Sequence, residues 1–143
     1  MFVEDFGPLR DTMRIVLEAH GYRVVEAVDG KEALAKFRTS KNKIDIVVTD
    51  VIMPNMNGKE LADLIRQETP DMRFIFVSGY TPASLKGKWR EDLGLVISKP
   101  VSPALLTRKI REVLDEVRSK TSLQKTIFKS LLMQPCDVLP GDV

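Results

Sequence analysis

The sequence of 143 residues lacks several features by which disulfide-bonded, membrane and nucleic-acid-binding proteins are recognised. It contains one cysteine, Cys136, which excludes an internal disulfide and agrees with a reducing compartment. No apolar run approaches the roughly 20 residues of a membrane span, and no charged and apolar leader precedes a cleavage site. The net charge of +2 comes from interleaved acidic and basic residues, which gives no argument for nucleic-acid binding. We therefore expect a soluble, cytoplasmic protein without membrane contact.

What the sequence does contain is a regular alternation of strand-like and helix-like segments. This alternation is typical of an α/β domain, in which helices cover both faces of a parallel sheet. The strand-like segments are residues 1–3, 22–28, 44–50, 73–77 and 95–98. The helical segments are residues 8–20, 30–39, 58–68, 81–93 and 102–117. We expect the helix at 81–93 to be short or irregular, because its proline and glycine content opposes a regular helix.

Polar residues stand where four of the strands end. Glu4 and Asp5 follow the first strand, Asp50 closes the third, Ser78 follows the fourth and Lys99 follows the fifth. The carboxyl ends of parallel strands meet at one edge of a sheet, so we expect these residues to converge. Taken singly, a strand-end Asp, a Lys before Pro or a Ser-Gly turn is ordinary structure. All of them together favour a shared chemical site.

The chemistry of this set favours phosphoryl transfer. Three neighbouring carboxylates repel one another and raise each other's pKa, unless a cation holds them in the charged form. Mg²⁺ suits such a cluster, because it binds a couple of carboxylates, a carbonyl and several waters. Asp50 can then attack phosphorus and form an acyl phosphate, while Lys99 and Ser78 contact phosphoryl oxygens that the metal does not reach.

These residues resemble the receiver domain of two-component signalling, the module of response regulators and hybrid histidine kinases. The resemblance covers residues 1 to about 117 and implies a flavodoxin-like, doubly wound five-stranded parallel sheet with strand order 2-1-3-4-5. The run Ser78–Thr81 is similar to receivers at the C-terminus of hybrid sensor kinases. The motifs that carry the resemblance are Glu4-Asp5, Thr49–Pro54 leading to Gly58, Ser78-Gly79, and Lys99-Pro100.

By this resemblance the protein is a phosphoacceptor switch. Asp50 accepts a phosphoryl group from a phosphohistidine of a histidine kinase or histidine phosphotransferase domain. Glu4 and Asp5 position Mg²⁺ together with Asp50, and the backbone carbonyl of Ile52 completes the protein ligands. Ile52 and Tyr80 offer no acid or amide that would orient an attacking water, so we expect slow self-dephosphorylation.

The resemblance also implies how the phosphoryl group is sensed. Ser78 is the switch hydroxyl and Lys99 pairs with the phosphoryl group, with a cis bond expected between Lys99 and Pro100. The family usually carries Tyr or Phe three positions before this lysine, where this chain has Val96. We therefore expect the response to pass through the Ser78 backbone and residues 79–93, with Trp89 as a fluorescent probe.

The pattern changes after residue 117, and we expect residues 118–143 to be an extension of the receiver domain. Its apolar residues predict an amphipathic helix over 122–133 that docks on the domain or on a partner, although a frayed extension fits equally well. Residues 135–143 are expected to be disordered. An extension of about 26 residues cannot form an ordinary output domain, so no direct DNA binding is expected. A dimer would use the 79–117 face or the extension.

Single positions of the sequence bear on three other functions. An aspartyl-phosphate phosphohydrolase usually needs a second acid two residues after its nucleophile, and that position is Ile52. A flavin-binding module needs a phosphate loop after the first strand, and Phe6–Arg10 is not one. A pseudo-receiver that binds a partner without phosphorylation is favoured only by Val96 and the short first strand. That strand is either tolerated by the sheet or indicates a piece of a longer hybrid kinase.

Overall fold

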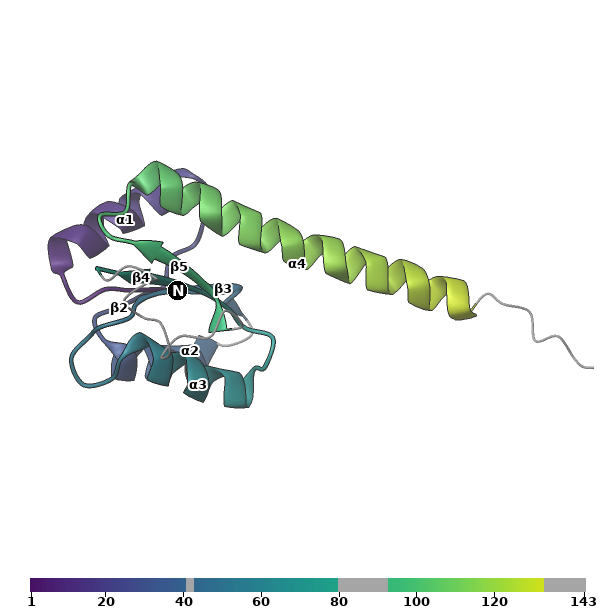
Figure 1. Cartoon of the computed structure of the whole chain (residues 1–143), viewed down its shortest axis with the longest axis horizontal. Helices are drawn as coiled ribbons and strands as arrows, with labels where there is room; N and C mark the ends of the chain where they lie inside the picture. The colour runs from purple at the N-terminus through teal and green to yellow at the C-terminus, as the bar shows by residue number, and fades with distance from the viewer. Residues whose placement is uncertain (41–42, 80–92, 133–143) are drawn as a thin grey trace, which may run out of the picture.

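The computed structural model describes residues 1–40, 43–79 and 93–132. Parallel pairing joins the strands of this part of the chain into one sheet of order β2-β1-β3-β4-β5 (Figure 1). The predicted α/β class and strand order 2-1-3-4-5 are confirmed. The elements are β1 (Phe2–Val3), α1 (Gly7–Ala19), β2 (Glu26–Ala27), α2 (Gly30–Ser40), β3 (Ile46–Asp50), α3 (Gly58–Glu68), β4 (Arg73–Ser78), β5 (Leu95–Ser98) and α4 (Pro103–Leu132).

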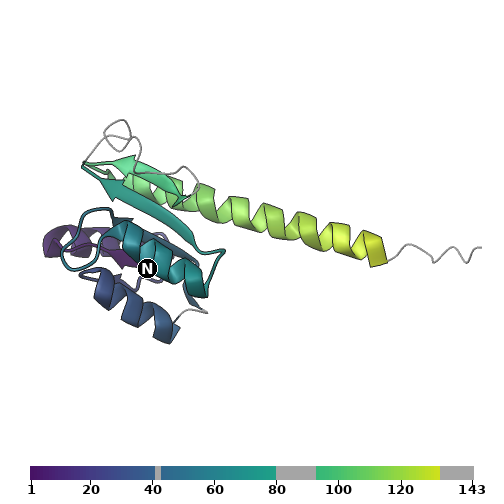
Figure 2. The same cartoon turned by 60° about the horizontal axis from the view of Figure 1, so that its bottom comes forward.

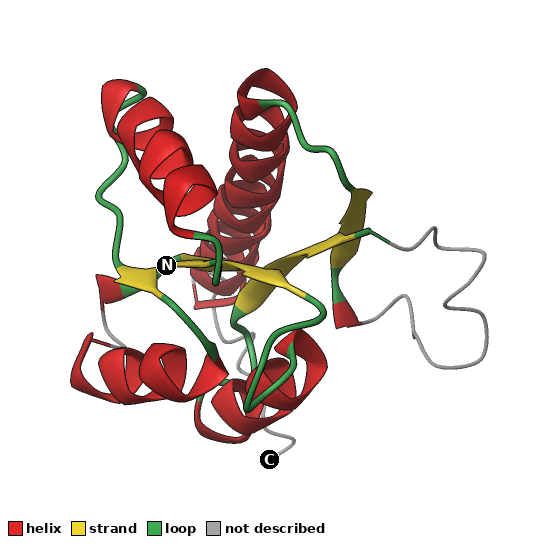
Figure 3. Cartoon of the chain, turned by 90° about the vertical axis from the view of Figure 1, so that its left-hand side faces the viewer, coloured by secondary structure: helices red, strands yellow, loops and turns green. Residues whose placement is uncertain are grey.

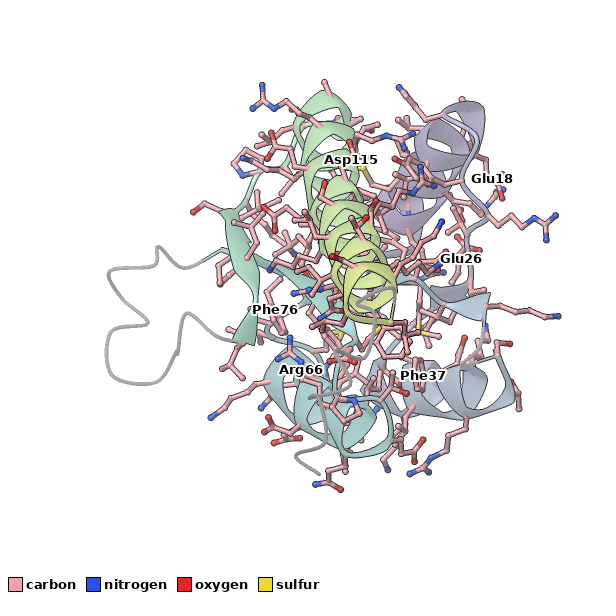
Figure 4. All side chains as sticks on the ribbon, turned by 90° about the vertical axis from the view of Figure 1, so that its right-hand side faces the viewer. Glu18, Glu26, Phe37, Arg66, Phe76 and Asp115 are labelled. Carbon is pink, nitrogen blue, oxygen red and sulfur yellow. The ribbon has the colours of Figure 1, made fainter. Side chains whose placement is uncertain are left out.

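The described helices cover the sheet in pairs, with α1 and α4 on one face and α2 and α3 on the other (Figure 3). Alternate residues of a strand point to opposite faces, so β3 places Val47 in one core and Val48 in the other. Phe37 from α2 and Phe76 from β4 belong to the same core and are fully buried (Figure 4). Burial of both faces explains why the central strands are continuous apolar runs in the sequence.

Capping residues determine where the two helices next to the site begin. Asn57 precedes α3, and its side-chain oxygen accepts a hydrogen bond from the Glu60 N–H at 2.8 Å. Ser102 precedes α4, and its hydroxyl oxygen accepts a hydrogen bond from the Leu105 N–H at 3.1 Å. Both caps fix where a helix leaves the edge of the sheet.

The second strand is shorter than predicted, since β2 contains only Glu26 and Ala27 of the expected range 22–28. Its neighbour β1 offers two residues for pairing, and these are Phe2 and Val3. A strand exists only where a neighbouring strand accepts its hydrogen bonds, so a short β1 limits β2 to the same length. The short first strand that the sequence indicates is therefore confirmed.

The last helix is longer than predicted, because the helix expected at 102–117 continues to Leu132. The polar segment 119–122 lacks Gly and Pro, so nothing in it stops a helix. Its hydroxyls also find acceptors within the helix, as Ser119 shows by donating to the Asp115 carbonyl at 3.0 Å. One continuous helix results. No helix in the described part of the chain is both long and apolar enough to cross a membrane.

Some predictions concern residues outside the described ranges. These are the helix at 81–93, the roles of Tyr80 and Trp89, and the disorder of 135–143. The amphipathic helix predicted at 122–133 falls within the described chain up to Leu132, where it is the last part of α4 and not a separate helix.

Candidate functional site

The predicted polar residues lie at the carboxyl ends of the strands. Asp50 is the last residue of β3 and Ser78 is the last residue of β4, and both are 3% exposed. Glu4 follows β1 and is also buried, whereas the adjacent Asp5 is exposed. Lys99 follows β5 directly. This edge of the sheet therefore combines buried and exposed polar groups, as a site open to a small ligand requires.

Three carboxylates form an acidic cluster at this edge. One oxygen from each of Glu4, Asp5 and Asp50 lies within 4.8 Å of the other two. Carboxylate oxygens at this spacing can share a small divalent cation, and the exposed Asp5 leaves room for its waters. The donor set fits Mg²⁺, which prefers few protein ligands and keeps much of its hydration shell.

Lys99 supplies the positive charge of the site. Its ammonium lies 2.8 Å from Asp50 Oδ1 and 3.8 Å from a Glu4 oxygen. Burial lowers the pKa of Lys99, but the hydrogen bond and charge of Asp50 outweigh that effect and raise the pKa above its ordinary value. Lys99 is therefore a permanent cation at the tip of a side chain that is 36% exposed.

Glu4 has an unusual proton affinity. Burial raises the pKa of Glu4 to about 8, and the hydrogen bond with Asp50 acts in the same direction. The Phe6 N–H, which donates to Glu4 Oε1 at 3.0 Å, acts in the opposite direction. Around neutral pH Glu4 thus carries a proton as long as no cation replaces it. Cation binding at the cluster must release this proton.

The ends of β4 and β5 are tied together beside Asp50. The Lys99 N–H donates to the Ser78 carbonyl at 2.7 Å, and Ser78 is in register with Ser98. The bond between Lys99 and Pro100 is cis, as expected. Val96 is partly buried and packs against the core on the side of α2 and α3. The backbone around Lys99 is therefore fixed by Ser78.

The turn after Asp50 closes around a glycine. The Gly58 N–H donates to the Val51 carbonyl at 2.8 Å. A Cβ on Gly58 would overlap the Asp50 carbonyl oxygen and crowd the Thr49 side chain. Only glycine lets α3 begin this close to the end of β3. Ile52 lies on this turn, and its side chain is 61% exposed.

One hydrogen-bonded link in this region was not predicted from the sequence. Asp29 Oδ1 accepts from the Glu32 N–H at 2.8 Å and caps α2, while Asp29 Oδ2 accepts from Asn55 Nδ2 at 3.2 Å. Asn55 has a positive φ of 69°, which asparagine tolerates better than most residues. An Asp before Gly30 is a recognisable N-cap signal, but its link to the turn after Asp50 has no signature in the sequence.

Arg10 was also missed. Its Nη1 donates to the Glu4 carbonyl at 2.8 Å, so the first turns of α1 hold the backbone of the acidic pair. No local pattern indicates this contact, because it depends on how the chain turns between β1 and α1. Both links support the loops that carry the acidic cluster.

Known proteins are similar to this chain in sequence and fold. The sensor kinase CckA of Brucella abortus (strain 2308) is 36% identical over 117 residues, which are 81% of this chain and 12% of that kinase. The crystal structure of the receiver domain from the hybrid histidine kinase CckA superposes with a TM-score of 0.68 at 32% identity, covering 79% of this chain and 95% of that one. A CheY-like response regulator receiver domain protein from Methanospirillum hungatei JF-1 gives a TM-score of 0.73 at 31% identity, covering 83% and 94%.

The chain thus spans about an eighth of the length of the sensor kinase that it resembles, and nearly all of the two receiver structures. The family model of the response regulator receiver domain matches residues 1–111, and the chain belongs to this family of two-component signalling domains.

Proposed function

We propose that the protein is a phosphoacceptor switch of a two-component phosphorelay, phosphorylated on Asp50. The surroundings of Asp50 carry this proposal. Its Oδ1 lies 2.8 Å from the Lys99 ammonium, and oxygens of Glu4 and Asp5 lie within 4.8 Å of one another and of Asp50. A buried carboxylate that only capped a turn would have no need of two further acids and a lysine.

The acidic cluster is proposed to hold Mg²⁺ through Glu4, Asp5, Asp50 and the backbone carbonyl of Ile52. The pKa of Glu4, raised first by burial and then by the hydrogen bond with Asp50, supports this role, because a bound cation would favour the charged form of this carboxylate. When bound, Mg²⁺ offsets the negative charge that an incoming phosphoryl group brings to the carboxylates.

The protein's own side chains would carry out the remaining steps of phosphoryl transfer. A carboxylate oxygen of Asp50 forms the new O–P bond while the P–N bond of a phosphohistidine breaks, and the imidazole keeps that electron pair. The Lys99 ammonium then contacts a phosphoryl oxygen instead of Asp50 Oδ1, and the Ser78 hydroxyl donates to another. Attack of water on the same phosphorus returns Asp50 to its starting state.

The phosphoryl donor is proposed to be a histidine kinase or a histidine phosphotransferase domain. The similarity to the receiver of the hybrid histidine kinase CckA supports this proposal and a place in the cytoplasm. We assign residues 1–117 to the receiver domain and residues 118–143 to a C-terminal extension.

Without divalent metal, the free energy of unfolding should fall as the pH rises from about 5 to about 6, below the range in which the buried Met1 amine, with its pKa lowered to about 6, has the opposite effect. Glu4 has a pKa of about 8 in the folded chain and an ordinary value, near 4.5, in the unfolded chain. The folded state therefore binds one more proton in this range, and stability falls by at most about 1.4 kcal/mol per pH unit. Urea unfolding at several pH values measures the slope.

Two variants and the metal test the cause of this slope. Glu4→Gln should flatten it, whereas Glu116→Gln, an exposed change on α4, should leave it unaltered. Saturating Mg²⁺ should remove or reverse the slope, because the cation binds the deprotonated cluster. A slope that persists in Glu4→Gln would assign the effect to another group and weaken the proposed metal site.

Ile52→Asn should speed the loss of the phosphoryl group by about tenfold. The Ile52 side chain is exposed beside Asp50 and cannot hydrogen-bond an attacking water, whereas an amide can orient one. The decay of the phosphorylated protein is followed by intact mass after the donor is removed. Ile15→Asn, an equally exposed change on α1, is the control and should decay like the parent. Equal lifetimes of Ile52→Asn and the parent would mean that water orientation does not control hydrolysis.

A further inference from the structure

The second half of α4, residues 118–132, extends past the rest of the described domain (Figure 1, Figure 2). Every residue of this segment is exposed. It nevertheless contains five large apolar side chains, which are 58% to 70% exposed. We call this set the apolar end of α4. Its members are Leu123, Ile127, Phe128, Leu131 and Leu132.

The apolar end continues the face through which α4 packs on its own domain. Phe128 and Leu132 follow Ile110 and Leu114 by 18 residues, which is about five complete helical turns. Ile110 is buried in the core between the sheet and α4, and Leu114 packs against that core. The same face is therefore buried along the first half of α4 and exposed to water along the second half.

The area of this apolar surface is large enough to form an interface with a partner. Full burial of a Leu, Ile or Phe side chain is worth about 1.5 to 3 kcal/mol. Covering the five side chains in two copies of the helix would bury on the order of 1,000 Å², near the lower limit of stable protein interfaces. A second copy of this chain therefore offers enough surface for a weak but specific pair.

We propose that the apolar end of α4 pairs, antiparallel, with the same segment of a second copy of this chain. A parallel pair is blocked, because along its first half α4 already packs on its own domain through the face that would contact the partner helix. The two domains would therefore overlap. An antiparallel pair puts the second domain at the far end, where α4 extends beyond the other described elements (Figure 2). The twofold axis would pass near Ile127 and Phe128, so that each copy presents the same surface.

The charges of the segment predict a particular response to salt. Residues 118–132 carry Arg118, Lys120, Lys125 and Lys129 and contain no Asp or Glu. Pairing two copies brings like charges together, but exposed charges repel by only a few tenths of a kcal/mol each, less than the apolar burial. Salt screens this repulsion. The dimer should therefore become tighter as salt increases, whereas binding to an acidic protein or an anionic membrane would become weaker.

Sedimentation of the full chain tests the proposal. Between about 1 and 100 µM, we expect a monomer–dimer equilibrium with a micromolar dissociation constant. Raising the salt from about 50 to about 500 mM should lower that constant. Asp50→Asn should dimerise like the parent, so this result does not depend on the proposed phosphoryl chemistry.

A pair of double variants separates the apolar face from the rest of the helix. Ile127→Gln with Phe128→Gln should weaken the dimer at least about 100-fold, because both copies lose two buried side chains. Ser122→Gln with Thr126→Gln changes the polar side of the same turns and should leave the dimer intact. Neither pair alters the charge, and all four positions are exposed, so the fold of the domain is not at risk.

The direction of pairing has its own measurement. In a Cys136→Ser background, spin labels at position 119 should be about 25 Å apart in an antiparallel dimer, and labels at position 126 much closer. A parallel dimer would give similar distances at both positions and overturn the geometry. A monomer at every concentration and salt would overturn the proposal itself. So would binding of the monomer to vesicles containing phosphatidylglycerol that is lost in the Ile127→Gln, Phe128→Gln variant.

Discussion

Asp50→Asn should abolish phosphorylation by a small phosphodonor such as acetyl phosphate in the presence of Mg²⁺. The amide is not a nucleophile for phosphorus and cannot form an acyl phosphate. The variant also loses the carboxylate that lies 2.8 Å from Lys99, whereas the nearest oxygen of Glu4 lies 3.8 Å from that ammonium. Intact mass should show one added phosphoryl group on the parent, sensitive to hydroxylamine, and none on the variant.

The control for this experiment is Asp63→Asn, which changes an exposed carboxylate on α3 and should accept the phosphoryl group like the parent. An adduct of equal size on Asp50→Asn would assign the phosphoryl group to another residue. A parent that takes up no phosphoryl group, although it is folded and binds Mg²⁺, would favour a pseudo-receiver that acts without phosphorylation.

Gly58→Ala should destabilise the domain by about 3 kcal/mol and weaken the site. The added Cβ would overlap the carbonyl oxygen of Asp50 and crowd Thr49, and neither is the mobile end of a side chain. The end of β3 or the start of α3 must move to make room, so Asp50 shifts relative to Lys99. Urea unfolding and the yield of phosphorylation measure the two effects.

Gly7→Ala is the matched control, because its Cβ would meet only the tip of the Arg10 side chain at 3.7 Å. This variant should be as stable as the parent or slightly more stable, since alanine favours a helix. If Gly58→Ala were as stable as Gly7→Ala, the close approach of α3 to β3 would not be required by the fold.

The central strands and the site edge were predictable because both follow from one property of a parallel sheet. Helices bury both faces, so β3 and β4 are mostly apolar, and a buried polar residue marks the point where each strand ends. Asp50 and Ser78 stand at those points. Since all the carboxyl ends lie at one edge, residues far apart in the sequence could be placed together without any knowledge of their contacts.

The features that the sequence did not indicate depend on contacts between two segments of the chain. β2 is short because β1 is short, and no pattern within residues 22–28 contains that information. The contact of Arg10 with the Glu4 carbonyl and that of Asn55 with Asp29 join different loops. The raised pKa of Glu4 is likewise a result of burial beside Asp50, which exists only after the strands are assembled.

The length of α4 gives it the properties of a lever. Its 30 residues form a rod of about 45 Å that begins at Pro103, close to Lys99 in the chain. A tilt of about 10° at that end, within the range of ordinary helix movements, would displace Leu132 by about 8 Å. A shift too small to measure at Asp50 could thus become a large displacement at the far end of the helix. Such amplification requires no aromatic side chain at position 96, where this receiver carries Val96.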